Sequence, residues 1–292
     1  MTAHLSRRAA LTAAIAFALP AHAAMPRRIV SLGGATTEIL YALGREAEIV
    51  GVDATSGFPA QALATKPNVG YLRALAAEGL LSLRPDLVLA QDGAGPPDTL
   101  RLVAQAGVRI ARIPDDPSEA GVLERIRAIA EATEAGPAGD RLAGEVRTAF
   151  ASLSAARDRL GAPRVRALVV LSIQNGRPLV AGRGTTGDAI LRLAGTENAV
   201  GGMVEGWKPL SDEGVIAAAP DALVVLSRGT ETPGADPLGL PAFAGTPAAR
   251  DRRLVRADAL TLLGFGPRTP QAAHDLLGEL YPEKRRAAED RR

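Results

Sequence analysis

Two short segments of the chain each place an aromatic side chain close to a cation. Gly70-Tyr71-Leu72-Arg73 holds the first pair, and Gly206-Trp207-Lys208-Pro209 holds the second, 136 residues later. We expect each segment to be a loop that comes just before a helix. If both loops face one cleft, they form a flat apolar slot rimmed by positive charge, which suits a planar, anionic, aromatic ligand.

Tyr71 and Arg73 form the more specific of the two pairs. A phenol has a pKa of about 10, and a guanidinium nearby favours its ionised form. The phenolate is a hard oxygen anion that can bind ferric iron, and tyrosine serves as an axial ligand of haem. The alternative is that Tyr71 only packs beside the following helix.

Other chemistry has few residues to carry it. The chain has no cysteine, which excludes disulfides and zinc-thiolate sites, and its only histidine after residue 23 is His274. A bare-metal site normally needs several histidines and carboxylates, and a Ser-His-Asp hydrolase needs a histidine in its triad, so both become improbable. The residues therefore favour a protein that is not an enzyme, with an exported α/β enzyme as a distant alternative.

The glycine-rich turn from Leu32 to Glu38 follows an expected strand and opens an expected helix. Backbone N–H groups in such a turn can cradle a phosphate. Its spacing matches neither a P-loop nor a dinucleotide fingerprint, so a helix N-cap at Thr36 or Thr37 is the favoured interpretation.

The N-terminal residues have the pattern of an export signal. Ser6-Arg7-Arg8 precedes an apolar run over 9–19, Pro20 ends the run, and Ala21-His22-Ala23 supplies small residues for cleavage. The paired arginines are compatible with the twin-arginine route, although Ala10 stands where that motif has a bulky apolar residue. We expect residues 1–23 to be removed and the product to reach the periplasm without entering the membrane.

The charge balance argues against nucleic acid and anionic lipid as partners. The sequence has 34 Lys and Arg against 32 Asp and Glu, and two of the arginines lie in the expected signal. Binding to polyanions needs a clustered excess of positive charge. We therefore expect no nucleic-acid partner.

Strand-like and helix-like segments alternate along the chain, which predicts parallel α/β structure. Expected strands cover 28–32, 48–53, 87–90, 108–113, 166–173 and 222–227, and expected helices cover 37–43, 74–83 and 188–193. A further helical pattern over 137–161 would be roughly 35 Å long, so it acts as a strut. The expected organisation is a signal peptide at 1–23, an N-terminal lobe at 24–136, a connecting backbone helix at 137–161 and a C-terminal lobe at 162–292. We predict two Rossmann-like lobes with a ligand cleft between them.

The two lobes repeat one another in sequence. Residues 75–86 align without a gap on residues 210–221, with five identities in twelve positions. The Pro-Asp pair in each copy is turn punctuation. Glu78 and Glu213 are not explained in that way, and their matching positions suggest a shared surface.

The sequence resembles the periplasmic haem-binding proteins of bacterial haem ABC importers, within the substrate-binding proteins that have a long helical backbone. The segments that carry the resemblance are 28–44, 69–79, 85–90, 182–185 and 206–211, and the most specific is Gly70-Tyr71-Leu72-Arg73. The resemblance implies that Tyr71 is the axial ligand of haem iron and that Arg73 supports it. Some relatives hold a second haem through a histidine of the C-terminal lobe, and this chain has none at such a position.

The resemblance also implies a partner. Glu78 and Glu213 match glutamates that dock onto arginines of an inner-membrane permease dimer. We expect a monomeric receptor that carries ferric haem to this permease, with Trp207 stacking on haem and Lys208 pairing with a propionate. The alternative ligands are the other chelates of the superfamily, cobalamin and ferric siderophores.

Overall fold

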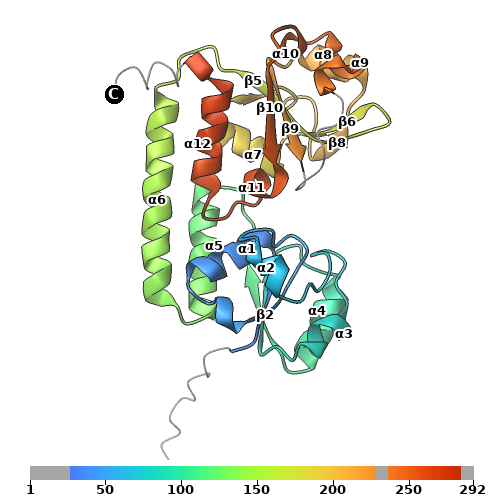
Figure 1. The fold of residues 1–292 in the computed structure, drawn as a ribbon. Helices are drawn as coiled ribbons and strands as arrows, with labels where there is room; N and C mark the ends of the chain where they lie inside the picture. Colours follow the sequence, from blue (N-terminus) through green and yellow to red (C-terminus); the bar gives the residue numbers. More distant parts are fainter. Residues whose placement is uncertain (1–26, 228–235, 284–292) are drawn as a thin grey trace, which may run out of the picture.

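The computed structural model describes residues 27–227 and 236–283 and shows two α/β lobes linked by helices (Figure 1). The expected signal peptide lies outside the described residues. The predicted fold class, two Rossmann-like lobes joined by one long helix, is confirmed. No helix within the described ranges has the length and apolar character needed to cross a membrane.

The N-terminal lobe is built on a four-stranded parallel sheet with the order β2-β1-β3-β4. Its strands are β1 (Ile29–Leu32), β2 (Ile49–Val52), β3 (Leu87–Gln91) and β4 (Arg109–Ile113). β1 and residues 87–90 of β3 are fully buried, as expected for apolar strands covered by helices on both faces. The helices of this lobe are α1 (Gly34–Ala42), α2 (Gln61–Thr65), α3 (Ala77–Ser82) and α4 (Pro97–Gln105), with a 3-10 turn, η1 (Glu46–Glu48).

The sheet of the C-terminal lobe is mixed rather than parallel throughout. Its order is β10-β9-β5-β6-β8, with β7 beside β5. β6 is antiparallel to β5 because a two-residue turn, Asn175-Gly176, joins them with φ values of 50° and 78°. The strands are β5 (Arg166–Gln174), β6 (Arg177–Ala181), β7 (Glu197–Asn198), β8 (Trp207–Pro209), β9 (Ala222–Ser227) and β10 (Leu254–Asp258).

Short helices surround this second sheet, and five of these helical segments begin with a polar cap. The caps are the side chains of Thr185, Ser211, Asp236, Thr246 and Asp258, which accept hydrogen bonds from backbone N–H groups at the starts of α7, α8, η2, α10 and α11. The helical segments are α7 (Thr186–Leu193), α8 (Asp212–Ala218), η2 (Pro237–Gly239), α9 (Pro241–Ala244), α10 (Pro247–Arg250), α11 (Ala259–Leu263) and α12 (Thr269–Leu280).

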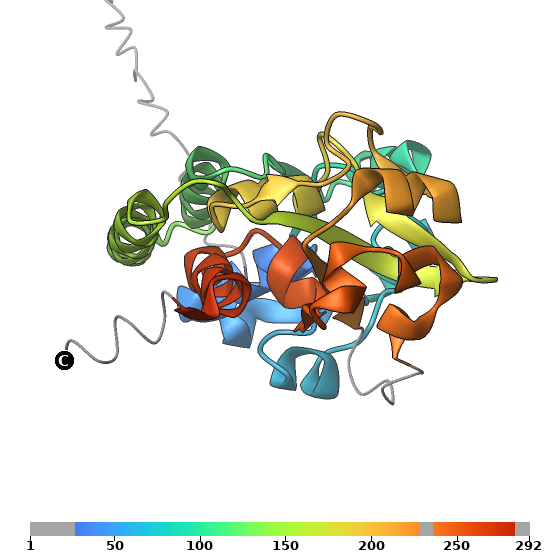
Figure 2. The same ribbon diagram turned by 90° about the horizontal axis from the view of Figure 1, so that it is seen from above.

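Three long helices form one side of the molecule, where the longest runs past both lobes with one of the others beside it in each lobe (Figure 1, Figure 2). They are α5 (Glu119–Ala132), α6 (Gly136–Asp158) and α12, and α6 packs against both of the others. One apolar core runs from Leu40 in the first lobe through Phe150 of α6 to Val169 and Leu276 in the second. The long helix is therefore a rigid part of both lobes.

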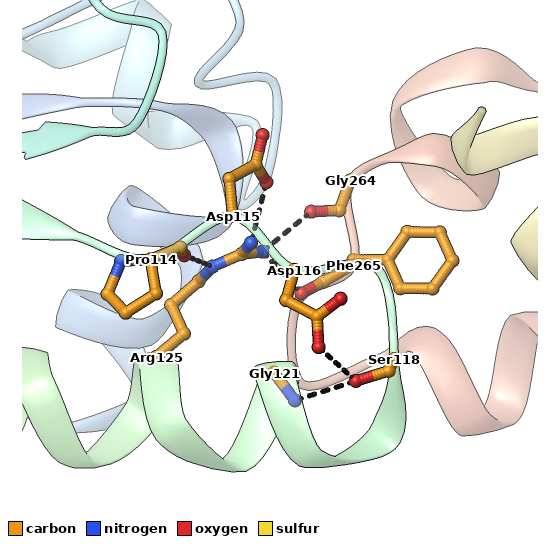
Figure 3. Close-up of polar contacts among 8 residues, drawn as sticks. All are labelled: Pro114, Asp115, Asp116, Ser118, Gly121, Arg125, Gly264 and Phe265. Atoms are coloured by element: carbon orange, nitrogen blue, oxygen red, sulfur yellow. Dashed lines mark hydrogen bonds and ion pairs between the residues drawn. The ribbon is translucent and has the colours of Figure 1, made fainter. Parts of the chain in front are cut away.

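Arg125 of α5 fastens the first lobe to the second (Figure 3). Its guanidinium is fully buried, and Nη1 donates to the carbonyl oxygens of Gly264 and Phe265 at 3.1 and 2.6 Å. Nη2 contacts Asp115 Oδ1 at 2.6 Å, and Nε donates to the carbonyl oxygen of Pro114 at 2.8 Å. Burial raises the pKa of Asp115 and lowers the pKa of Arg125, so each charge depends on the other.

The start of α1 differs from the sequence expectation. The helix begins at Gly34 with Gly33 before it, so Thr36 and Thr37 lie inside the helix and neither is its cap. The Thr37 hydroxyl is instead buried between Ser31 Oγ and Ser56 Oγ, at 2.7 Å from each. Gly33 N–H donates to Asp53 Oδ1 at 2.8 Å. A carboxylate of the protein therefore occupies the N–H group of this turn that could otherwise bind a phosphate.

Candidate functional site

The carboxyl ends of the parallel strands of each lobe point toward the other lobe. After β2 the chain reaches Gly57, where a Cβ atom would lie 2.7 Å from Leu260 Cδ1 of α11. After β10 the chain forms α11 and then the segment that receives Arg125. In open α/β sheets ligands bind beyond the carboxyl ends of the strands, so this junction is the expected binding region.

Tyr71 lies on a loop of the first lobe with its side chain turned outward. The side chain is 51% exposed, whereas Leu72 and Leu75 are 7% and 5% exposed and anchor the loop to the core beneath. Arg73 is exposed as well. This alternation places the phenol and the guanidinium on the outer side of one loop.

Backbone hydrogen bonds hold this loop in place. Ala54 N–H donates to the Gly70 carbonyl at 2.8 Å, and Ala74 N–H donates to the Tyr71 carbonyl at 2.8 Å. Leu72 and Leu75 bond through their backbones to Gly95, at 3.0 Å each. Gly70 has a φ of +98°, a conformation that favours glycine. The loop therefore presents Tyr71 from a fixed backbone.

Neither the Tyr71 hydroxyl nor the Arg73 guanidinium makes a hydrogen bond or ion pair with another residue that the structure describes. Both side chains are also exposed. The two groups are therefore available to a ligand, and the loop brings them to the same surface.

The structure does not place Trp207 and Lys208 as expected. They lie on an edge strand, β8, and not on a loop, because β8 pairs with β6 through Trp207 and Ala181. The indole is half-buried, and a Cβ atom on Gly187 would lie 3.2 Å from its Cη2 atom. Because successive strand residues point to opposite faces, Lys208 is directed away from the indole and is exposed.

The structure brings together three residues at the lobe junction that sequence reasoning did not select. Phe58 is 44% exposed, and the Arg268 guanidinium carbon lies 3.5 Å from the centre of its ring. Arg268 also pairs with Glu38, with Nη2 at 3.1 Å from Oε2 and the backbone N–H at 3.1 Å from Oε1. Burial raises the pKa of Glu38, and Arg268 opposes that shift.

Glu78 and Glu213 occupy equivalent positions in the two lobes. Each is the second residue of a short helix, α3 and α8, and each is exposed. Both helices lie on the side of the molecule away from α6 (Figure 1, Figure 2). A hydrogen bond from its own backbone N–H and one from Ser211 hold the pKa of Glu213 below its usual value. Glu213 is therefore a stable negative charge on this surface.

Within 27–227 and 236–283, no group of three or more His, Cys, Asp or Glu side chains is arranged to hold a metal ion. The donor that stands out in the described site is the phenol oxygen of Tyr71. A single oxygen donor suits a metal that already has other ligands, as in a chelate.

Comparison with known proteins assigns the family. Residues 29–260 match the family described as periplasmic binding protein. The chain belongs to this family. As a periplasmic binding protein it is a substrate-binding protein of an ABC importer and not an enzyme, as the sequence predicted.

Two solved structures show the similarity in detail. The periplasmic haem-binding protein RhuT of Roseiflexus sp. RS-1, in its apo form, is 40% identical with a TM-score of 0.81, covering 88% of this chain and 99% of that one. The periplasmic haem-binding protein BhuT, in complex with two haems, is 40% identical with a TM-score of 0.82, covering 88% and 98%. A vitamin B12-binding protein of Pectobacterium atrosepticum is 26% identical over 203 residues, which is 69% of this chain and 72% of that protein.

Proposed function

We propose that this periplasmic binding protein takes up ferric haem at the junction of its lobes and delivers it to an inner-membrane ABC permease. The observation that carries the proposal is the exposed phenol of Tyr71, held on a fixed loop with Arg73 two residues away. A tyrosine oxygen is an axial ligand of haem iron in known proteins. RhuT and BhuT, both haem-binding proteins, are 40% identical to the chain.

The residues of the site have separate roles in this proposal. Tyr71 supplies the axial oxygen, and Arg73 places a positive charge two residues from it, on the same side of the loop. Lys208 is exposed and pairs with a propionate, a carboxylate at the edge of haem. Trp207 is proposed to hold β8 in position, because its ring packs against Gly187 and not outward beside Lys208.

Glu78 and Glu213 are proposed to dock the loaded protein onto the permease. They lie at matching places on the two lobes, and the shared core fixes their separation. A two-fold symmetric permease can contact both with equivalent basic residues.

Export to the periplasm is proposed to depend on residues 1–23.

Cobalamin is the second candidate, because the vitamin B12-binding protein of Pectobacterium atrosepticum is also similar to the chain. A titration of the purified protein with ferric haem, cobalamin and a ferric siderophore separates the candidates. We expect ferric haem to bind and to give a high-spin spectrum with a tyrosinate charge-transfer band. Binding of cobalamin or the siderophore without binding of haem would overturn the proposal.

A further inference from the structure

Phe58 and Tyr71 are the two aromatic side chains classed as exposed among the described residues; the rest are buried or partly buried. They lie on neighbouring segments. Val52 bridges to Asn68, and Ala54 N–H bonds to the Gly70 carbonyl at 2.8 Å, so the chain after β2 runs beside the Tyr71 loop. An exposed aromatic ring loses the burial that normally stabilises it, and two such rings on adjacent loops suggest a shared apolar ligand.

Phe58 also lies where the second lobe approaches. Leu260 of α11 is 42% exposed, and a Cβ atom added at Gly57, the residue before Phe58, would lie 2.7 Å from Leu260 Cδ1. Phe58, Tyr71 and Leu260 are three of the seven exposed large apolar side chains among the described residues. Phe58 and Leu260 therefore lie where the lobes meet, and Phe58 is on the segment that runs beside the Tyr71 loop.

Arg268 fixes the ring of Phe58 from the second lobe. The guanidinium lies over one face of the ring at 3.5 Å from its centre, and Glu38, which is 8% exposed, holds the guanidinium from behind. Arg268 Nε is buried without a hydrogen-bond partner in the part of the chain that the structure describes. The guanidinium therefore keeps its contacts with the Phe58 ring and with Glu38, although this leaves its Nε donor without a hydrogen bond.

We propose that Phe58 is a further contact of the flat ligand, stacking on it beside Tyr71, and that Arg268 is the residue that positions Phe58. The cation covers one face of the ring, and its attraction to the ring electrons holds that ring in one orientation. The ring surface left exposed offers an offset stacking partner to a planar aromatic ligand. This inference rests on the proposed haem function and adds an aromatic contact to it.

The test uses ferric haem as the probe and measures the rate of its transfer to an excess of apomyoglobin. Phe58→Ala should release haem about tenfold faster than wild type, which is the typical size of one aromatic stacking contact. Its tyrosinate spectrum should be unchanged, since Tyr71 remains. Leu102→Ala is the matched control, because Leu102 is 49% exposed on α4 outside this region, and it should release haem at the wild-type rate.

A double-variant cycle tests the role of Arg268. Arg268→Met alone should speed release about threefold, and adding it to Phe58→Ala should change the rate no further, because Arg268 acts through Phe58. Additive effects of the two substitutions would overturn that role. If Phe58→Ala does not fold, Phe58→Leu serves in its place, since it keeps the apolar volume and removes the ring.

The two levels of the proposal fail in different ways. Wild-type protein that binds no haem overturns the proposed function itself. Wild-type protein that binds haem through Tyr71, together with a Phe58→Ala variant that releases it at the wild-type rate, overturns only the stacking contact. A fall in thermal stability of Phe58→Ala without faster release would give the Phe58–Arg268 pair a purely structural role and would also overturn it.

Discussion

Glu78 and Glu213 each stand second in a short helix, 135 residues apart in the sequence and at matching places in the two lobes. The helix starts with N–H groups that have no intrahelical partner, so a negative side chain is favoured there whatever its function. Exposure in both lobes is what makes a docking role testable. A structural role predicts an effect on stability, and a docking role predicts an effect on transport.

The Glu78→Lys, Glu213→Lys double variant should lose haem uptake into vesicles that contain the permease. The variant should remain folded with only a modest loss of thermal stability, because both side chains are exposed and the reversal removes a favourable charge from each helix start. Its haem spectrum should match wild type. Glu131→Lys with Glu145→Lys, two exposed carboxylates on α5 and α6, is the control and should transport normally. Normal uptake by the Glu78→Lys, Glu213→Lys variant would show that the two glutamates are ordinary surface residues and do not dock the protein onto the permease.

Arg73→Ala should weaken the retention of ferric haem without removing the tyrosinate spectrum. The substitution deletes a positive charge two residues from the ligand and leaves the ligand oxygen in place. Haem transfer to apomyoglobin should therefore be several-fold faster than in wild type, and Arg73→Lys should restore much of the loss. An unchanged transfer rate in Arg73→Ala would show that another group supports the ligand.

Arg125→Met should lower the free energy of unfolding by about 3 kcal/mol, because it leaves Asp115 and two interlobe carbonyls without their buried donor. Chemical denaturation monitored by circular dichroism gives the value. Arg101→Met is the matched control, since the Arg101–Asp98 pair has 61% and 82% exposed side chains and should contribute well under about 1 kcal/mol. Equal losses in the two variants would contradict the role of Arg125 in fastening the lobes.

Glu38 should make stability depend on pH in a defined direction. Burial raises its pKa in the folded protein, against the opposing effect of Arg268, so the folded protein takes up this proton at a higher pH than the unfolded chain. The stability that comes from this extra proton uptake is fully present below the unfolded pKa of about 4.5, and it is lost as the pH rises through the pKa of Glu38 in the folded protein. The stability of wild type relative to Glu38→Gln should therefore increase as pH is lowered from 7 toward about 4.5.

Thermal unfolding of the two proteins across this range measures the effect. Glu213→Gln is a control of opposite sign, since the pKa of Glu213 is lowered and its contribution is lost at acidic pH. A constant difference between wild type and Glu38→Gln at every pH would show that Glu38 titrates alike in the folded and unfolded chains.

Much of the fold follows from local sequence patterns. Strands β1, β3 and β9 are continuous apolar runs that fill a buried sheet, and each was expected within one residue of its bounds. α3 begins at Ala77, later than predicted, because Leu75 bonds through its backbone to Gly95 and its carbonyl accepts from Thr99. β6 was not predicted, although Asn175-Gly176 is a strong hairpin signal.

The site was less accessible to sequence reasoning. Tyr71 and Arg73 were selected because both lie in one short segment and their chemistry is complementary. Arg268 and Glu38 are 230 positions apart, and no local sequence pattern indicates that they form an ion pair. No pattern indicates that Arg268 packs on Phe58 either. The expected pairing of Trp207 with Lys208 assumed a loop, and the strand pairing of β8 separates the two side chains.

The absorption spectrum of the ferric-haem complex of Tyr71→Phe, compared with wild type, tests the central claim most directly. Phenylalanine keeps the ring on the same anchored loop and removes only the oxygen. We predict that the variant folds normally, loses the tyrosinate charge-transfer bands and retains haem much more weakly. A wild-type spectrum in Tyr71→Phe would show that another residue holds the iron and would contradict the account.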